Sequence, residues 1–156
     1  PVNGGPNRIT VNYNLNPYSF LMTLVHEIAH VEVWVNYKNR VKPHGREWKS
    51  FFGEKLNEVL DGNQFPLDIE KALRRHARKP LASSGADISL ARVLKIYDEE
   101  QWLTIEELPD NALFSIHNGK KFRKLDKERK RFRCLCLDNK KIYMVHPMTQ
   151  VIMESE

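Results

Sequence analysis

The first regular pattern in the chain is an alternation of apolar and polar residues over residues 9–15. A period of two is typical of a half-buried β-strand, because successive side chains of a strand point to opposite faces. Asn16 and Pro17 follow, and they are favoured residues for the N-cap and the first turn of a helix. We therefore predict a strand that ends at Leu15 and a helix that begins at Pro17.

The next segments have the spacing of helices, with apolar residues every three or four positions. We predict a first helix over about 17–36, and its apolar face comprises Leu24, Ile28, Val31 and Val35. A second helix follows the polar stretch 36–43 and closes at Asp61-Gly62. Its apolar face comprises Trp48, Phe52, Leu56 and Val59. Shorter patterns predict helices over 67–77 and 89–97.

The pattern changes after residue 80. Residues 80–85 are rich in proline, serine and glycine, as linkers are, and short β-rich runs separated by turn residues begin at Ala112. These runs cover 113–116, 131–137 and 141–145. The predicted organisation is a core over 1–80, a linker over 81–88, and a helix with a small antiparallel β appendage over 89–156. The predicted fold class is α+β.

Composition adds limits to this picture. A chain of 156 residues with 41% hydrophobic residues can bury a core, and it contains neither a membrane-length apolar run nor a secretion signal. Cys134 and Cys136 are too close in sequence for an easy mutual disulfide, which fits a reducing compartment. We therefore expect an intracellular, cytoplasmic protein without a membrane partner. Because the chain opens with Pro1 rather than Met, we also expect a segment upstream.

The net charge of +5 is concentrated in one basic segment, residues 120–133. This segment has nine basic residues and two acidic residues, a net charge of +7, so the rest of the chain carries −2. Its basic residues are Lys120, Lys121, Arg123, Lys124, Lys127, Arg129, Lys130, Arg131 and Arg133. They could neutralise several phosphates of a nucleic acid, or they could form a solvated hairpin whose charge keeps it soluble.

His26-Glu27-Ile28-Ala29-His30 is an HExxH motif within the first predicted helix. Residues four apart share a helix face, so both imidazoles can reach one zinc ion. Glu27 can then act as the general base that activates a zinc-bound water for hydrolysis of a peptide bond. The motif thus predicts a zinc metallopeptidase that acts on a protein or peptide substrate.

A third zinc ligand is needed to complete a catalytic site with an open fourth position. Val33 and Asn36 occupy the positions where a metzincin has Gly and His, which excludes that class. Glutamates of the second helix, namely Glu47, Glu54 and Glu58, are possible ligands. His44 is the better candidate, because it precedes this helix and Gly45 allows a sharp turn of the backbone.

The run from Thr23 to His30, followed by His44-Gly45-Arg46-Glu47-Trp48, resembles the SprT-like family, which includes the Spartan proteases. The resemblance covers about residues 8–60. It implies a zincin-like core in which His26, His30 and His44 bind one Zn²⁺ and Glu27 is the catalytic base. It also implies that the preceding strand edges the cleft, where an extended substrate can pair with it.

The resemblance also bears on the tail. Arg131 to Cys136 resembles the start of the zinc ribbon that family members carry, but the second cysteine pair is missing. Cys134 and Cys136 could bind a second metal with His117 and His146, although a metal-free hairpin is favoured. Since Spartan-type proteases degrade proteins crosslinked to DNA, the resemblance favours DNA as partner of the basic segment, with a nucleoid-associated location.

Three functions therefore remain open from the sequence. The first is a zinc endopeptidase that acts on DNA-associated or DNA-crosslinked proteins. The second is a nucleic-acid-binding module in which the zinc site is structural or catalytically silent. The third retains the zinc hydrolase chemistry but directs it at a non-protein substrate, since activated water also attacks other electrophiles.

Overall fold

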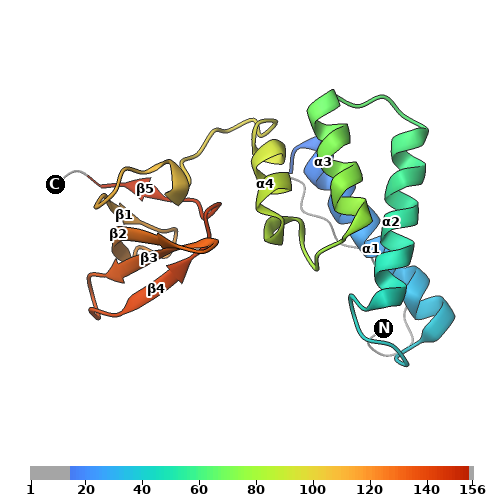
Figure 1. Cartoon of the computed structure of the whole chain (residues 1–156), viewed down its shortest axis with the longest axis horizontal. Helices are drawn as coiled ribbons and strands as arrows, with labels where there is room; N and C mark the ends of the chain where they lie inside the picture. The colour runs from blue at the N-terminus through green and yellow to red at the C-terminus, as the bar shows by residue number, and fades with distance from the viewer. Residues whose placement is uncertain (1–14, 155–156) are drawn as a thin grey trace. The chain divides into compact units, whose positions relative to one another are not determined.

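The computed structural model describes residues 15–154 and divides the chain into two compact units, Pro1–Glu99 and Glu100–Glu156. In the described part, the first unit contains four α-helices and the second a five-stranded antiparallel sheet (Figure 1). The α+β class predicted from the sequence is confirmed. The strand predicted over residues 9–15 falls, except for Leu15, outside the described residues.

Helix α1 (Pro17–Tyr37) begins where the sequence predicts. The side chain of Asn16 accepts hydrogen bonds from the backbone N–H groups of Tyr18 and Ser19, at 3.1 and 2.9 Å. These bonds satisfy two donors that have no partner inside the helix. Pro17, at the first helical position, has no N–H to satisfy. The N-cap prediction is therefore confirmed.

The buried face of α1 differs from the predicted one. Leu24, Ile28 and Val31 are only half-buried and Val35 is 54% exposed. The side chains that enter the core come from the neighbouring stripe, which comprises Met22, Val25, Ala29 and Val33. The sequence places apolar residues on both stripes of the helix, so periodicity alone could not show which stripe is buried. The stripe that packs in the core with α2 is the one that includes the small residue Ala29.

Three further helices complete the first unit: α2 (Arg46–Asp61), α3 (Leu67–Arg78) and α4 (Ile88–Lys95). Their apolar faces meet that of α1 in one hydrophobic core. The largest fully buried apolar side chains of this core are Trp48, Phe52, Leu56, Ile69, Leu73 and Leu90. The α2 stripe predicted from the sequence is confirmed for Trp48, Phe52 and Leu56, while Val59 is half-buried and Leu60 is buried.

The sequence predicted that the helix over 89–97 belongs with the β appendage. Helix α4 instead lies in the first unit. Leu90 and Leu94 are buried in the helical core, and Asn16 donates a hydrogen bond to the backbone oxygen of Leu94 at 2.9 Å. The break between the units consequently follows Glu99, whereas the linker was predicted over 81–88. The segment has the serine and glycine of a linker, but these residues form a short 3₁₀ turn, Ser84–Ala86, within the first unit.

At Gly53, helix α2 lies close to the backbone of α3. A Cβ atom at Gly53 would lie 2.8 Å from the backbone oxygen of Ala77. We expect Gly53→Ala to lower the free energy of unfolding by about 1–3 kcal/mol, because the helices must move apart. Chemical denaturation measures this loss. Gly85→Ala is the matched control, since its Cβ would meet no atom within 4 Å, and an equal loss in both variants would contradict the steric explanation.

The second unit contains the strands β1 (Leu113–Ser115), β2 (Lys121–Glu128), β3 (Arg131–Cys136), β4 (Ile142–Val145) and β5 (Ile152–Met153). They form an antiparallel sheet in the order β4-β3-β2-β1-β5. A short 3₁₀ helix, Ile105–Glu107, contributes buried Ile105 to its core beside Phe114, Phe122 and Phe132. This unit thus has a hydrophobic core of its own.

The sequence predicted three of these strands and missed β2 and β5. In β2, the buried positions are Phe122 and Lys124. Because a lysine occupies a core position, the alternation of apolar and polar residues is lost in the basic segment. Strand β5 has only two residues, both exposed, and therefore has no pattern to recognise.

None of the helices described within residues 15–154 combines the length and the apolar character of a membrane span.

Candidate metal centre

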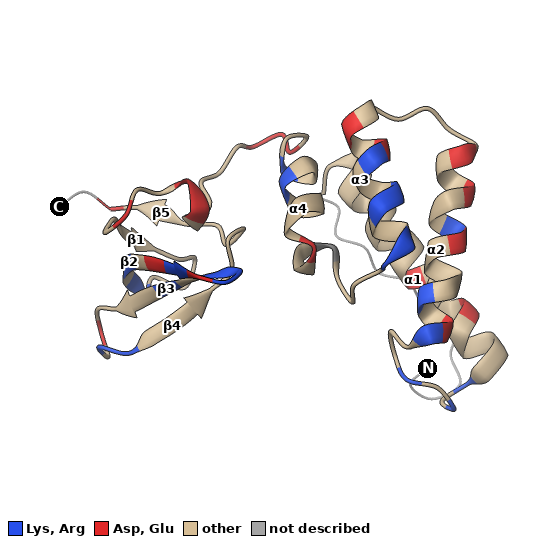
Figure 2. Cartoon of the chain, in the orientation of Figure 1, with Lys and Arg blue, Asp and Glu red and all other residues tan. Residues whose placement is uncertain are grey.

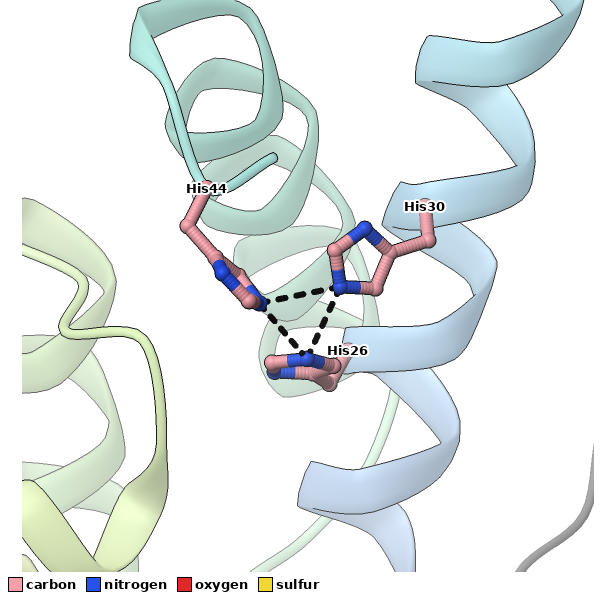
Figure 3. A group of neighbouring side chains, drawn as sticks. All are labelled: His26, His30 and His44. Carbon is pink, nitrogen blue, oxygen red and sulfur yellow. Dashed lines mark hydrogen bonds between the residues drawn. The ribbon is translucent and has the colours of Figure 1, made fainter. Parts of the chain in front are cut away.

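Three histidine side chains converge between α1 and the start of α2 (Figure 3). The Nε2 atom of His30 lies 3.0 Å from Nε2 of His26 and 3.0 Å from Nε2 of His44, and the third side of this triangle is 3.1 Å. Among the described residues, these three form the one group of potential ligands close enough to share an ion, and Glu47, Glu54 and Glu58 lie outside it. The predicted histidine set is therefore brought together.

The triangle suits a cation better than a set of hydrogen bonds. A ring nitrogen that carries hydrogen can donate but has no lone pair left to accept, so three Nε2 atoms cannot all be hydrogen-bonded to one another. An ion held at about 2.0–2.1 Å by three ligands in tetrahedral geometry requires nitrogens about 3.3–3.4 Å apart. The observed separations of 3.0–3.1 Å are close to this requirement. The three histidines thus fit a metal ion.

Helix geometry places two of the ligands and an unusual turn places the third. His26 and His30 lie four residues apart on α1, so they share a face. His44 has a φ of 55°, in the left-handed region. The sequence suggested that Gly45 makes the sharp turn, but Gly45 has an ordinary φ of −70°. Its role is steric, because a Cβ there would lie 2.8 Å from the backbone oxygen of Lys42.

Trp48 forms the floor of the histidine cluster. Its ring centroid lies 4.8 Å from those of His26 and His44 and 5.6 Å from that of His30. Trp48 is fully buried and stacks on Phe52 with a centroid distance of 4.9 Å. The sequence placed Trp48 in the apolar stripe of the second helix and in the family motif that begins at His44, but predicted no contact with the ligands. Its position one helical turn after His44 was the available signal for that contact.

The surroundings of the cluster lower the pKa of its two histidines on α1, His26 and His30. Burial and the neighbouring histidines lower the pKa of His26 from 6.5 to about 4. Burial also lowers the pKa of His30, and His44 acts in the same direction. Neutral imidazole is the form that binds metal ions. At neutral pH the first helix therefore presents two ligands that need not lose a proton before they bind.

These pKa shifts predict acid sensitivity of the metal-free protein. The unfolded chain takes up a proton on His26 near pH 6.5 and the folded chain only near pH 4, so stability falls as pH falls across this window. Thermal unfolding of metal-free protein between pH 7 and 4 measures the effect. His26→Gln should flatten the dependence, and an unchanged pH profile in this variant would contradict the assignment.

Glu27 faces a pocket that adjoins the histidine cluster. The pocket has a volume of about 220 Å³, and His26, Glu27 and Thr23 of α1 form one wall. Phe52 of α2 and His76 of α3 also line it. Residues 81–83 close another side, so part of the predicted linker contributes to the site. The predicted base therefore lies beside a metal ligand in a space that a substrate side chain or backbone could enter.

The basic residues of the segment lie in different environments. Lys124 is buried, donates to the backbone oxygen of Leu108 and lies over the ring of Phe132. Lys121 pairs with Glu154 at 2.9 Å and Arg133 with Asp126 at 3.3 Å. Four exposed basic residues lie around the β2–β3 turn, which Figure 2 shows in blue, and they are Lys127, Arg129, Lys130 and Arg131. Lys120 and Lys121 are also exposed but lie at the other end of β2. The nine residues thus do not form one surface.

Both cysteines lie in the hydrophobic core of the second unit. Cys134 and Cys136 are buried, unpaired thiols beside Phe122 and Phe132. Burial raises the pKa of Cys134 to about 11, which opposes formation of the thiolate that binds metals. Within residues 15–154, no metal-binding group includes them.

Residues 6–71 match the SprT-like family. The matched segment contains His26, Glu27, His30 and His44, so the resemblance seen in the sequence motifs is confirmed over this range. No curated protein and no solved structure matches the chain. Together, the family match and the three histidines suggest a metallopeptidase-like segment in which His26, His30 and His44 could hold a metal ion.

Proposed function

We propose that the protein is a zinc-dependent endopeptidase. The observation that carries this proposal is the convergence of three Nε2 atoms, 3.0–3.1 Å apart, beside a pocket that Glu27 lines. Three protein ligands with a fourth position open are typical of catalytic zinc sites, whereas structural sites use four. An all-imidazole set favours zinc over magnesium or calcium, which prefer oxygen ligands.

Glu27 has the central part in the reaction. When bound by the three histidines, zinc would polarise the scissile carbonyl and make water acidic enough to lose a proton near neutral pH. The Glu27 carboxylate accepts that proton as the water attacks, and then delivers it to the leaving amine. Met22 and Phe52 give the pocket apolar walls, which contact an apolar side chain of the substrate.

A peptidase assay with metal removal and restoration tests the proposal. Unfolded casein should be cleaved by protein reconstituted with one equivalent of zinc, and a chelator should abolish cleavage. Activity should return with zinc but not with magnesium. Cleavage that persists after complete removal of metal would contradict the proposal, and so would an absence of cleavage of every protein and peptide tested with zinc-loaded protein.

We also propose DNA as a partner, with DNA-associated or DNA-crosslinked proteins as substrates. The support is the exposed basic cluster at the β2–β3 turn, where Lys127, Arg129 and Lys130 have no ion-pair partner among the described residues. Cations on an exposed turn can reach the phosphate backbone without reading the base sequence. In the alternative function, the protein is a nucleic-acid-binding module with a silent metal site, and the same basic turn contacts the nucleic acid.

Salt dependence tests the basic turn as the DNA contact, and peptidase activity distinguishes the two proposals. Replacing Lys127, Arg129 and Lys130 together by Gln should weaken DNA binding and reduce the salt slope by about one per lost phosphate contact. Lys121→Gln is a control, because this lysine already pairs with Glu154. DNA binding that the triple variant leaves unchanged would exclude the turn as the contact. Binding without any peptidase activity would favour the alternative module.

A further inference from the structure

His76 is a polar side chain in an unusual place. It lies on α3 with only 1% of its surface exposed, among the largest fully buried side chains of the described chain. Its Nδ1 atom lies 3.0 Å from Oδ2 of Asp87, and its ring meets Phe52 edge-on at a centroid distance of 5.7 Å. Sequence analysis did not single out His76, because a histidine near the basic end of a helix is usually a surface residue.

Nε2 of His76 keeps access to the pocket beside Glu27. No described residue bonds to Nε2, since Asp87 is the one hydrogen-bond partner of this side chain and it contacts Nδ1. His76 lines the pocket together with His26 and Glu27. Because Asp87 contacts Nδ1, Nε2 is the ring nitrogen left for a ligand in that space.

Asp87 fixes the orientation and tautomer of the ring. Its Oδ1 accepts from the backbone N–H of Leu90 at 3.2 Å and caps α4, while Oδ2 faces Nδ1 of His76. Burial acts to raise the pKa of Asp87, but the bonds from His76 and Leu90 outweigh it and hold the pKa below the ordinary value. An ionised carboxylate accepts only, so Nδ1 carries the hydrogen, and in the neutral form of the ring Nε2 has a lone pair that can accept a hydrogen bond.

We propose that His76, positioned by Asp87, is a further catalytic residue whose Nε2 accepts a hydrogen bond from the N–H of the scissile peptide bond. The proposal rests on the peptidase function. The bond orients the nitrogen so that its developing lone pair points away from His76 and towards the proton on Glu27. It strengthens when Glu27 delivers its proton to the leaving nitrogen, because the N–H of a positively charged nitrogen is a stronger donor than that of an amide, and it requires no net proton transfer to His76.

A matched pair of substrates tests this role. A cleavage site found in casein is synthesised as a peptide and as a depsipeptide, in which an ester oxygen replaces the scissile N–H. His76→Asn retains an amide that can donate to Asp87 but has no atom at the position of Nε2. We expect this variant to lose about 10–100-fold in kcat/KM on the peptide and to cleave the ester at nearly the wild-type rate.

Asp87→Asn is the second variant, and it retains an oxygen that can cap α4. It should also lose activity on the peptide more than on the ester, because the tautomer of His76 is no longer fixed. Zinc content and the thermal midpoint, measured for both variants, verify the fold. If His76→Asn does not fold, the peptide-to-ester ratio of Asp87→Asn provides the test.

The possible outcomes are distinct. Selective loss on the peptide supports the proposal. Equal loss on both substrates, or no loss on either, overturns the role of His76 while the peptidase function stands, provided that Glu27→Gln is inactive on both. If zinc-loaded wild type cleaves neither substrate and does not differ from Glu27→Gln, the peptidase function fails and the role of His76 fails with it.

Discussion

Glu27→Gln should lower kcat for peptide hydrolysis by about 10²–10⁴-fold, the usual contribution of a general base. Glutamine has nearly the shape of glutamate but cannot accept the proton of the attacking water. Because Glu27 lies outside the histidine triangle, the variant should retain stoichiometric zinc and its thermal midpoint. Steady-state kinetics on one peptide, with metal analysis of the same samples, measures both effects.

Glu32→Gln is the matched control for this prediction. Glu32 lies on the same helix and undergoes the same loss of charge, but it does not line the pocket. Its kcat should remain within a factor of about two of wild type, since most surface substitutions have small effects. Comparable loss in both variants would mean that charge on α1, and not proton transfer by Glu27, governs the rate. Full activity of Glu27→Gln would remove its assigned role.

His44→Ala is expected to abolish stoichiometric zinc binding and, with it, peptidase activity. Two imidazoles on α1 cannot alone complete a tetrahedral catalytic site. The variant should also lose the stabilisation that zinc gives the folded state, which is about 4 kcal/mol at a zinc concentration a thousand times the Kd. Metal analysis after dialysis and thermal unfolding with and without zinc measure these losses.

Two controls separate His44 from its alternatives. His117→Ala removes an exposed histidine of the second unit and should leave zinc content unchanged. Glu47→Ala tests the glutamate that follows His44 in the motif, and it should also retain zinc because Glu47 lies outside the ligand cluster. Loss of zinc in Glu47→Ala together with its retention in His44→Ala would show that the third ligand is the carboxylate.

The metal site was largely predictable because its key residues are local in sequence. His26, Glu27 and His30 lie within one helical turn, so helix geometry alone places them. His44 is fourteen residues from His30, and a single short connection returns it to the same face. The turn itself was not predictable, since the left-handed residue is His44 and the glycine serves only for clearance.

The rest of the site depends on contacts between distant segments. His76 reaches the pocket and Asp87 reaches His76 only because α3 and α4 pack as they do, and periodicity contains no information on that packing. For the same reason, the sequence could not assign α4 to the helical unit or recognise that Lys124 belongs to a core. Buried polar residues follow no apolar pattern, so sequence analysis places them on the surface.

X-ray absorption at the zinc edge of the reconstituted full chain is the most direct test of the metal centre. The account predicts one zinc per chain with three imidazole nitrogens at about 2.0–2.1 Å and one oxygen from solvent. His26→Ala, His30→Ala and His44→Ala should each lose this signature. Absence of bound zinc after reconstitution, or a sulfur ligand from Cys134 or Cys136, would contradict the account.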